Sequence, residues 1–538
     1  MPEWDLRAPA PELADAYRRA GWWNDDTLGR LVERGMRAAP AAPVRIWSKT
    51  RPWRGTLGDV LDLSARFAGG LRALGVGPGD IVAVQVPNWV EGAATWFASS
   101  MLGAVVVPIV HYYGTHELSY ILRESHARVL VIADRFGAVD HVANLEAVRP
   151  DLGALEHVVV VGDELPTGAT RFQDLLDGGR VDTSVTVDPA SPALVAYTSG
   201  TSANPKGVIQ SHRALGAEVR THLPTLIPSG RRPVLLGAPI SHATGMLLGL
   251  LLPASRGESI QLIDAWDPAL VLDAMLTDDL SAGSGATVFL TSLLDHPSFT
   301  DDHRARMTSV VLGGSSVPTA IAADAEARGI RAVRSYGLTE MPTVTGAAPD
   351  EPGARRTSTD GHGLAGVEIR IVGDDGTEAA PGDAGEIVTR GPDLFAGYTD
   401  DALTHEFLDP DGWFATGDIG VLEDGWLTIT DRKKDMIIRN GVNISPAEVE
   451  NALLRLPAIA EVAVVGRPDP RTGERAVAFL RMRAGEAEPD LDVLRAHLET
   501  VGLGRPKWPE EVQLVDEFPR TAAGKVKKFE LRAELRER

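Results

Sequence analysis

The stretch YTSGTSANPKGV, residues 197–208, sets the first expectation about the fold. It follows the apolar run Ala193–Ala196, which is typical of a buried strand, so its hydroxyl groups and glycines are predicted to lie at a strand end, where ligands often bind. Together with the ammonium group of Lys206, these groups are suited to phosphate oxygens. A solvated Ser/Thr/Gly turn explains the same composition, so the stretch alone leaves both interpretations open.

Two common nucleotide-binding motifs are excluded by their context. Pro205 stands where a Walker A loop needs its second glycine, so a P-loop NTPase is ruled out. Residues Gly361–Gly366 match the pattern GxGxxG, but they precede the strand-like VEIRIV and do not open a helix. The sequence therefore carries no dinucleotide fingerprint at this position.

Composition limits the classes of protein that need to be considered. The 538 residues are 44% apolar and 24% charged, which predicts a globular protein with at least two domains. The chain has no cysteine, so disulfides, cysteine-ligated zinc and a cysteine nucleophile are excluded. A formal charge of −21 disfavours nucleic acid as a partner. Neither a membrane span nor a signal peptide is recognisable, so we expect a cytoplasmic protein.

The pattern of apolar runs predicts an α/β fold. Short β-branched runs alternate with Ala- and Leu-rich segments, which is typical of layered parallel α/β subdomains. From about residue 365 apolar and polar residues alternate between Asp-Gly turns, which predicts a small β-rich subdomain over 365–430. We expect an N-terminal domain over 1–433 and a small, mobile C-terminal α+β domain over 434–538. The runs predicted as strands of the larger domain include 81–86, 105–110, 129–133, 158–161, 233–236, 287–290 and 309–312.

Five further stretches identify a family when they are taken with 197–208. They are Pro239–His242, Ser335–Met341, Thr416–Gly420, Asp431–Asp435 and Pro519–Lys525. In this order they closely resemble the motifs of the acyl-adenylate-forming superfamily of acyl-CoA synthetases, luciferases and nonribosomal adenylation domains, over nearly the whole chain. The general resemblance is nearest to bacterial fatty-acyl and cyclohexanecarboxylate-type CoA ligases. It implies that ATP and Mg²⁺ activate a carboxylic acid as an acyl-adenylate, and that coenzyme A then takes the acyl group.

The resemblance also implies which residues do this work. Thr339, Glu340, His242 and Lys525 are the expected catalytic residues, with Glu340 as the ligand of magnesium. Lys525 would bridge the carboxylate and the α-phosphate, and His242 would stand between the acyl pocket and the pantetheine channel. The expected ATP-binding residues are Thr198, Ser199, Gly200, Thr201 and Lys206 at the phosphates, Gly314, Ser315 and Tyr336 at adenine, and Asp418 and Arg432 at the ribose.

The remaining assignments concern the second half-reaction and the acid. Lys434 matches the hinge of the family, and Arg439 and Gly441 belong to the loop expected beside the pantetheine channel. The acyl pocket is predicted near Met246, Gly313, Leu338 and Met341. These residues are apolar or small, so an amino-acid substrate, whose ammonium group needs an acidic partner, is disfavoured.

Three alternatives stay open at this point. In the first, coenzyme A accepts the acyl group. In the second, an acyl carrier protein or another nucleophile accepts it. A non-catalytic ATP- or acyl-binding relative is the third interpretation, against which the intact Lys206, Glu340, Asp418, Arg432 and Lys525 argue. The sequence does not distinguish a monomer from a homodimer, nor a fatty acid from an alicyclic or aromatic one.

Overall fold

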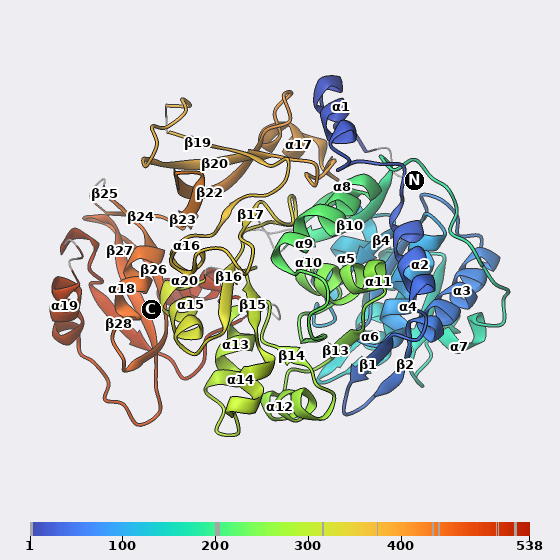
Figure 1. Cartoon of the computed structure of the whole chain (residues 1–538), viewed down its shortest axis with the longest axis horizontal. Helices are drawn as coiled ribbons and strands as arrows, with labels where there is room; N and C mark the ends of the chain where they lie inside the picture. Colours follow the sequence, from blue (N-terminus) through green and yellow to red (C-terminus); the bar gives the residue numbers. More distant parts are fainter. Residues whose placement is uncertain are drawn as a thin grey trace.

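The computed structural model describes residues 4–198, 205–314, 317–373, 375–432, 435–439, 442–501, 503, 505–520 and 524–537. Figure 1 shows the N-terminal half of the chain on the right, the later antiparallel strands at the top and the C-terminal elements on the left. The fold is α/β with a smaller C-terminal unit, as the sequence predicts.

A sheet of eight strands forms the centre of the N-terminal half. Its middle strands are parallel and fully buried, because helices cover them and leave little room for polar residues. One edge is different: β10 and β11 pair antiparallel. The strand order is β21 (Gly397–Tyr398), β11 (Lys206–Ser211), β10 (Pro192–Thr198), β4 (Val105–Pro108), β3 (Ile81–Gln85), β5 (Val129–Ala133), β8 (His157–Val161) and β9 (Thr170–Arg171).

Three smaller sheets are built from strands that precede residue 335. The five-stranded sheet has the order β14 (Ser281–Ala282), β12 (Val234–Leu236), β13 (Ile260–Ile263), β1 (Pro43–Trp47) and β2 (Trp53–Thr56). The two-stranded sheets are β15 (Ser309–Leu312) with β16 (Arg331–Arg334), and β6 (Arg135–Phe136) with β7 (Val139–Asp140).

Helices pack between and around these sheets. The α3–α4 pair carries Phe67, Trp96 and Phe97, which are among the largest fully buried side chains. The helices are α1 (Pro11–Arg19), α2 (Leu28–Ala38), α3 (Leu57–Ala73), α4 (Val90–Met101), α5 (Thr115–Glu124), α6 (His141–Val148), α7 (Phe172–Leu175), α8 (His212–Ala217), α9 (Leu223–Leu226), α10 (Ala243–Gly245), α11 (Leu252–Arg256), α12 (Pro268–Thr277), α13 (Thr287–Leu294), α14 (Asp301–Arg306), α15 (Thr319–Ala327) and α16 (Gly353–Ser358). The π-helical turns are η2 (Glu218–His222) and η3 (Met246–Leu251), and η1 (Arg149–Asp151) is a 3₁₀ turn.

One predicted strand is wrong. Residues 287–290 begin helix α13 and do not form a strand. The helix buries Phe289, Leu290, Leu293 and Leu294, a spacing that places all four on one side. A short apolar run of β-branched and aromatic residues does not distinguish a strand from a buried helix, and here tertiary packing decides.

The antiparallel sheet expected from about residue 365 begins earlier, at Thr345. Its order is β17 (Thr345–Gly346), β18 (His362–Gly363), β23 (Trp426–Arg432), β22 (Phe414–Glu423), β20 (Ala384–Arg390) and β19 (Glu368–Val372), with α17 (Asp401–Phe407) beside it. The GxGxxG stretch runs through β18 towards β19 without opening a helix, so the rejection of a dinucleotide motif is confirmed.

The C-terminal elements build a separate sheet. β24 and β25 pair antiparallel, and the Ser445 hydroxyl accepts from the Glu448 amide at 3.1 Å to cap the next helix. The strands are β25 (Val442–Ile444), β24 (Ile437–Arg439), β27 (Gly473–Met482), β26 (Ile459–Asp469) and β28 (Glu511–Leu514). The helices are α18 (Pro446–Leu453), α19 (Leu491–Thr500) and α20 (Lys528–Glu537), with the 3₁₀ turn η4 (Arg505–Lys507).

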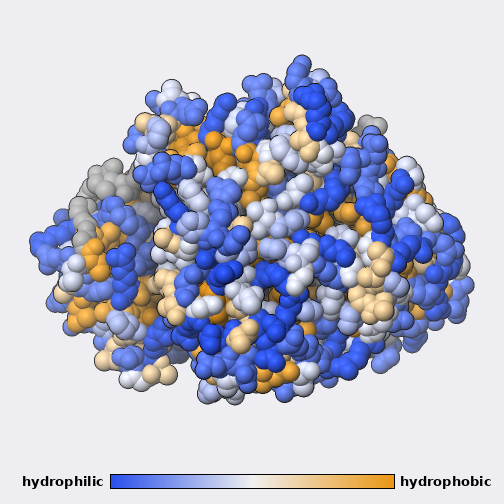
Figure 2. All heavy atoms as spheres, viewed as in Figure 1, coloured by the Kyte–Doolittle hydropathy of each residue, from blue (hydrophilic) through white to orange (hydrophobic). Residues whose placement is uncertain are grey.

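The surface agrees with the composition. The face in Figure 2 is mainly hydrophilic, with smaller hydrophobic patches between the charged side chains. Among the described residues no helix is long and apolar enough to cross a membrane.

Buried His212 gives the fold a defined acid sensitivity. The side chain is 1% exposed, its Nδ1 accepts from the Leu28 amide at 3.3 Å, and its buried Nε2 has no hydrogen-bond partner in the described chain. Burial lowers the pKa of His212 from 6.5 to about 4. His212 therefore binds a proton below about pH 6.5 in the unfolded chain but only below about pH 4 in the folded chain. The free energy of unfolding decreases as the pH is lowered through this range.

When the pH is lowered from 7 to 5, the free energy of unfolding of His212→Asn, which keeps an acceptor oxygen, should decrease by about 2 kcal/mol less than that of the wild type. Urea unfolding followed by tryptophan fluorescence at the two pH values measures the difference. Equal losses in the two proteins would contradict this explanation.

Candidate active site

The two described ends of the stretch 197–208 pair as the strands of a hairpin. Thr198, the last residue of β10, pairs with Lys206, the first residue of β11. The hairpin loop, with the predicted phosphate-binding residues Ser199, Gly200 and Thr201, lies outside the described residues. The described part therefore places a hydroxyl group and an ammonium group side by side at the base of this loop.

Aromatic rings hold the ammonium group of Lys206. Its Nζ lies 4.0 Å from the ring centroid of Phe407 and 5.4 Å from that of Tyr398. A cation is attracted to the faces of aromatic rings at these distances. The contact orients a long, flexible side chain at the mouth of the hairpin, where a phosphate would need it.

The turn Ser335–Met341 carries the next predicted residues and is held from below. The Gln210 side-chain amide donates to the carbonyl oxygens of Thr339 at 3.0 Å and of Glu340 at 3.2 Å. The Phe395 amide donates to the same Glu340 carbonyl at 2.8 Å. Gly337 is required here because an added Cβ atom would come within 1.8 Å of the Pro342 carbonyl oxygen. The backbone of the turn is thus fixed before any ligand binds.

The carboxylate of Glu340 is buried and oriented by a tyrosine. Glu340 is only 8% exposed, and its Oε1 accepts a hydrogen bond from the Tyr398 hydroxyl at 2.7 Å. Burial, with the negative charge of Glu340 beside it, raises the pKa of Tyr398. The hydroxyl group therefore stays protonated and donates a hydrogen bond to the carboxylate. Carboxylate oxygens are the donors that Mg²⁺ prefers, so this residue fits the magnesium ion that the sequence implies.

The residues predicted around the nucleoside contact one another. The Tyr336 hydroxyl donates to Asp418 Oδ2 at 2.7 Å, and Asp418 faces Arg432 across the β22–β23 ladder. The side chain of Arg432 and the whole of Ser315 lie outside the described residues. Gly314 follows β15 with a φ of +78°, a conformation that favours glycine.

A narrow cavity of about 10 Å³ lies beside the turn. Three predicted residues line it: His242, Met246 and Thr339. Its other lining residues are Pro108, Leu194, Ala196, Gln210, Leu215, Ser241, Ala243 and Pro342.

Three residues predicted for the acyl pocket are not among those that line this cavity. Met341 is fully buried in an apolar cluster with Val344 and Ile387, and its Sδ lies 3.6 Å from Thr389 Oγ1. Met341 therefore packs in the core of the antiparallel sheet, and its assignment to the acyl pocket stays a prediction. The Leu338 amide donates to the Met341 carbonyl, which closes the turn. Gly313 packs against Ser335 instead.

The loop with Lys525 reaches this region from the C-terminal elements. A Cβ atom on Gly524 would lie 2.6 Å from Val288 Cγ1 and 3.3 Å from Ala286 Cβ, so the loop packs against the start of α13. Burial lowers the pKa of His242, and the positive charge of Lys525 lowers it further. The imidazole is therefore neutral near pH 7, and its Nδ1 accepts from the Thr244 amide at 3.4 Å.

The residues predicted for the second half-reaction are not assembled at the cavity. The guanidinium group of Arg439 makes two hydrogen bonds to Glu510, at 2.9 and 3.0 Å, within the C-terminal elements. Lys434 and Gly441 lie outside the described residues.

Sequence reasoning missed Gln210, Tyr398 and Phe407. In the sequence Gln210 is an ordinary polar residue of a strand, and Tyr398 and Phe407 have the composition of core residues. Their contacts with the turn and with Lys206 depend on which strands and helices become neighbours, and no local spacing encodes that.

Comparisons with known proteins agree with this geometry. Residues 32–399 match the family described as AMP-binding enzyme, and residues 448–525 match the AMP-binding enzyme C-terminal domain. The medium-chain fatty-acid–CoA ligase of Escherichia coli (strain K12) is 31% identical over 97% of this chain and 93% of its own length. The indoleacetate–CoA ligase of Aromatoleum aromaticum is 33% identical over 87% and 91%. The structure of ATP-bound MatB from Rhodopseudomonas palustris superposes with a TM-score of 0.83 at 26% identity, covering 94% of this chain and 98% of that one.

The Tyr398 hydroxyl provides a direct test of how Glu340 is held. Tyr398→Phe removes the donor and leaves the ring beside Lys206, so we expect about a tenfold loss of kcat/KM, since a hydrogen bond to a charged group contributes about 1.5–3 kcal/mol. The magnesium concentration for half-maximal activity should rise as well. Tyr17→Phe is the matched control, because the Tyr17 hydroxyl is buried without a hydrogen-bond partner in the described chain. An unchanged magnesium response in Tyr398→Phe would contradict the role of this contact.

Proposed function

The chain belongs to the AMP-binding enzyme family, and on that premise we propose that it activates a hydrophobic acid whose only charged group is its carboxylate. Enzymes of this family form an acyl-adenylate from ATP and a carboxylic acid and then transfer the acyl group to coenzyme A. The chain is an enzyme of this type, an ATP-dependent acyl-CoA ligase.

The lining of the cavity is the observation that carries the choice of acid. Its residues are apolar except for Gln210, Ser241, His242 and Thr339, and none of them is acidic or basic at neutral pH, because His242 is uncharged. An ammonium group or a second carboxylate would lose its hydration there without gaining an ionic partner. The relatives named above act on a medium-chain fatty acid and on indoleacetate, which are acids of this kind.

The adenylation step requires one anion to approach another. Thr198 and Lys206 bind the β- and γ-phosphates together with the residues of the hairpin loop, and Thr339 binds the α-phosphate. Tyr336 and Gly314 contact adenine, and Asp418 and Arg432 bind the ribose hydroxyls. The close packing of the turn excludes water, which would hydrolyse the mixed anhydride.

Glu340 is the residue that would hold Mg²⁺, and the ion would supply positive charge at the phosphates as pyrophosphate leaves. The buried carboxylate and its hydrogen bond from Tyr398 support this assignment. The hydroxyl group keeps the carboxylate in one orientation, so little reorganisation is needed when the nucleotide binds.

Lys525 stabilises the approach of the carboxylate to the α-phosphate. The positive charge of Lys525 lowers the pKa of His242, which lines the cavity. The ammonium group is therefore near the point where acid and nucleotide meet. A positioned cation offsets the repulsion between the two anions and the charge that develops on the phosphoryl oxygens.

Transfer to coenzyme A requires a different arrangement. We assign the hinge to Lys434, between a domain over 1–433 and one over 434–538, and the channel loop to Arg439 and Gly441. His242 separates the cavity from the channel for the thiol. In the present arrangement Arg439 is bound to Glu510 of the same C-terminal unit and is not among the residues that line the cavity. We infer that the whole unit turns to bring this residue to the channel.

The two half-reactions separate the role of Lys525 from a general effect on the enzyme. Lys525→Ala should lower the rate of adenylate formation by about 10²–10³, the cost of removing one preorganised group that stabilises the transition state. Thioester formation from supplied acyl-adenylate should change by less than about threefold, because that step no longer has the two anions to join.

Lys527→Ala is the matched control, because Lys527 forms an ion pair with Glu530 at 2.8 Å, two residues from Lys525. It should leave both half-reactions close to the wild type. Quenched-flow assays of acyl-AMP and acyl-CoA measure the two steps. Equal losses in both half-reactions for Lys525→Ala would contradict the assigned role.

A further inference from the structure

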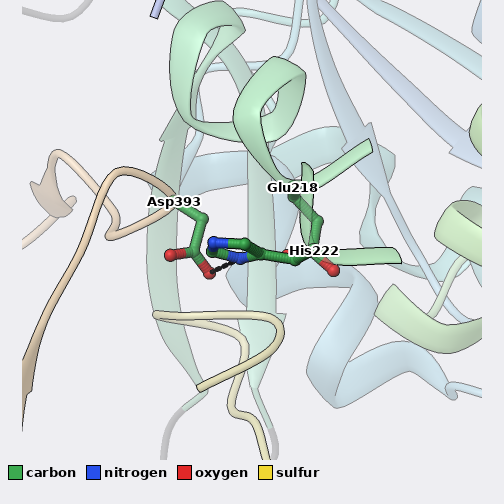
Figure 3. A group of neighbouring side chains, drawn as sticks. All are labelled: Glu218, His222 and Asp393. Atoms are coloured by element: carbon green, nitrogen blue, oxygen red, sulfur yellow. Dashed lines mark hydrogen bonds and ion pairs between the residues drawn. The ribbon is translucent and has the colours of Figure 1, made fainter. Parts of the chain in front are cut away.

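A buried group of three side chains lies next to Thr343, just after the turn Ser335–Met341. Glu218 and His222 come from the π-helical turn η2, and Asp393 comes from the segment between β20 and β21; Figure 3 shows the three facing one another. All three side chains are completely buried. One nitrogen or oxygen atom from each lies within 4.8 Å of the other two.

The imidazole of His222 is fixed by a backbone contact. Its Nε2 lies 2.9 Å from the carbonyl oxygen of Ala365, so Nε2 carries a hydrogen and donates it. In the neutral imidazole this leaves the lone pair on Nδ1, which faces Glu218 Oε2 at 3.1 Å and Asp393 Oδ2 at 3.6 Å. A carbonyl partner on the far nitrogen is the usual arrangement of a histidine that ligates a metal.

The carboxylate of Glu218 is held in the same manner. The Thr343 hydroxyl donates to its Oε1 at 2.6 Å, which leaves Oε2 directed at His222. His222 and Glu218 are therefore each oriented by a second contact, to the Ala365 carbonyl and to the Thr343 hydroxyl. Such outer contacts cost conformational freedom, and they are expected where the atoms in front have to stay in one place.

Asp393 supplies the decisive observation. Both of its carboxylate oxygens are buried, and neither has a hydrogen-bond partner in the described part of the chain. Its separation of 3.6 Å from His222 Nδ1 is too long for a hydrogen bond. A buried carboxylate without a donor is strongly unfavourable. A proton on Nδ1 would form ion pairs with both carboxylates, but it would hydrogen-bond only to Glu218 at 3.1 Å and would set one positive charge against two negative charges.

We propose that Glu218, His222 and Asp393 bind one divalent metal ion. The ion satisfies Asp393, and its two positive charges balance two carboxylates around a neutral imidazole. Ligand atoms about 2.1 Å from a tetrahedral ion lie roughly 3.4 Å apart, close to the separations of 3.1 and 3.6 Å from Nδ1. One nitrogen and two oxygen donors match Zn²⁺ best, whereas Mg²⁺ and Ca²⁺ prefer oxygen alone.

This ion is structural, and it is distinct from the magnesium at Glu340. It joins η2 to the segment that contains Asp393 and Phe395, and Thr343 connects it to the end of the catalytic turn. The Phe395 amide in turn donates to the Glu340 carbonyl. The metal therefore fixes, from the interior, the backbone on which Glu340 is presented. The site goes beyond the proposed reaction, because no step of that reaction needs it.

Complete burial determines how the site has to be tested. The ion enters while the chain folds and exchanges slowly afterwards, so the metal has to be present during expression. We would express the full-length chain in defined medium with added ZnSO₄, purify it without a metal-affinity step, dialyse it against EDTA and measure metal by inductively coupled plasma mass spectrometry. The wild type should retain close to one equivalent of zinc per chain.

Variants locate the ion. Asp393→Asn and Glu218→Gln, which keep the shape of each side chain, should each retain less than a tenth of an equivalent. His362→Gln is the matched control, because His362 pairs with Glu351 at 3.1 Å outside this group, and it should retain the full equivalent. Glu340→Gln should also retain it, which separates this ion from the magnesium of the reaction.

Crystals of the wild type provide the second measurement, which does not depend on the folding of any variant. An anomalous difference map at the zinc edge should place a peak between His222 Nδ1 and the two carboxylates. Wild-type protein without stoichiometric metal, a peak elsewhere, or retention of metal by both Asp393→Asn and Glu218→Gln would overturn the proposal.

Discussion

The hydrogen bond from Tyr398 to Glu340 joins the two halves of the active site. Tyr398 is on β21, the edge strand that pairs with β11, and β11 begins at Lys206. The same strand supplies Gln210, which donates to the carbonyl oxygens of Thr339 and Glu340. One antiparallel edge of the central sheet thus sets the positions of the Lys206 ammonium group and of the Glu340 carboxylate, the groups that we propose bind the phosphates and the metal. If the edge shifted by one residue, side chains would change faces and both groups would be lost together.

Charge explains why this edge has to be built so firmly. The chain has a formal charge of −21, and its ligands are anions, so binding depends on a few cations at defined positions. Phe407 and Tyr398 orient Lys206 without neutralising it, whereas Arg439 is already paired with Glu510. Lys525, on a loop that packs against Val288, is the cation that we propose is brought to the site by the C-terminal unit. This division leaves the triphosphate site fixed and makes the meeting of acid and nucleotide depend on the C-terminal unit.

Much of this could be predicted from the sequence, since the motifs are local. The strand before the hairpin and the strands found within 81–86, 105–110 and 129–133 follow from short apolar runs. Asp418 faces Arg432 across the β22–β23 ladder and Met246 lines the cavity, and the roles assigned to these residues stay predictions. The helix at 287–294 and the burial of Met341 could not be predicted, because each depends on packing partners distant in sequence. The same holds for Tyr398, and for Asp393 beside His222.

The most direct test is a mass-spectrometric assay of the purified chain with ATP, Mg²⁺ and a panel of acids, with and without coenzyme A. The panel should contain medium-chain, alicyclic and aromatic monocarboxylic acids beside amino acids and dicarboxylic acids. The account predicts acyl-CoA with an equal amount of AMP from one or more of the hydrophobic monocarboxylic acids, and acyl-adenylate from the same acids when coenzyme A is omitted. A preference for an amino acid or a dicarboxylic acid would contradict the reading of the cavity, and adenylate that coenzyme A does not convert would contradict the assigned acceptor.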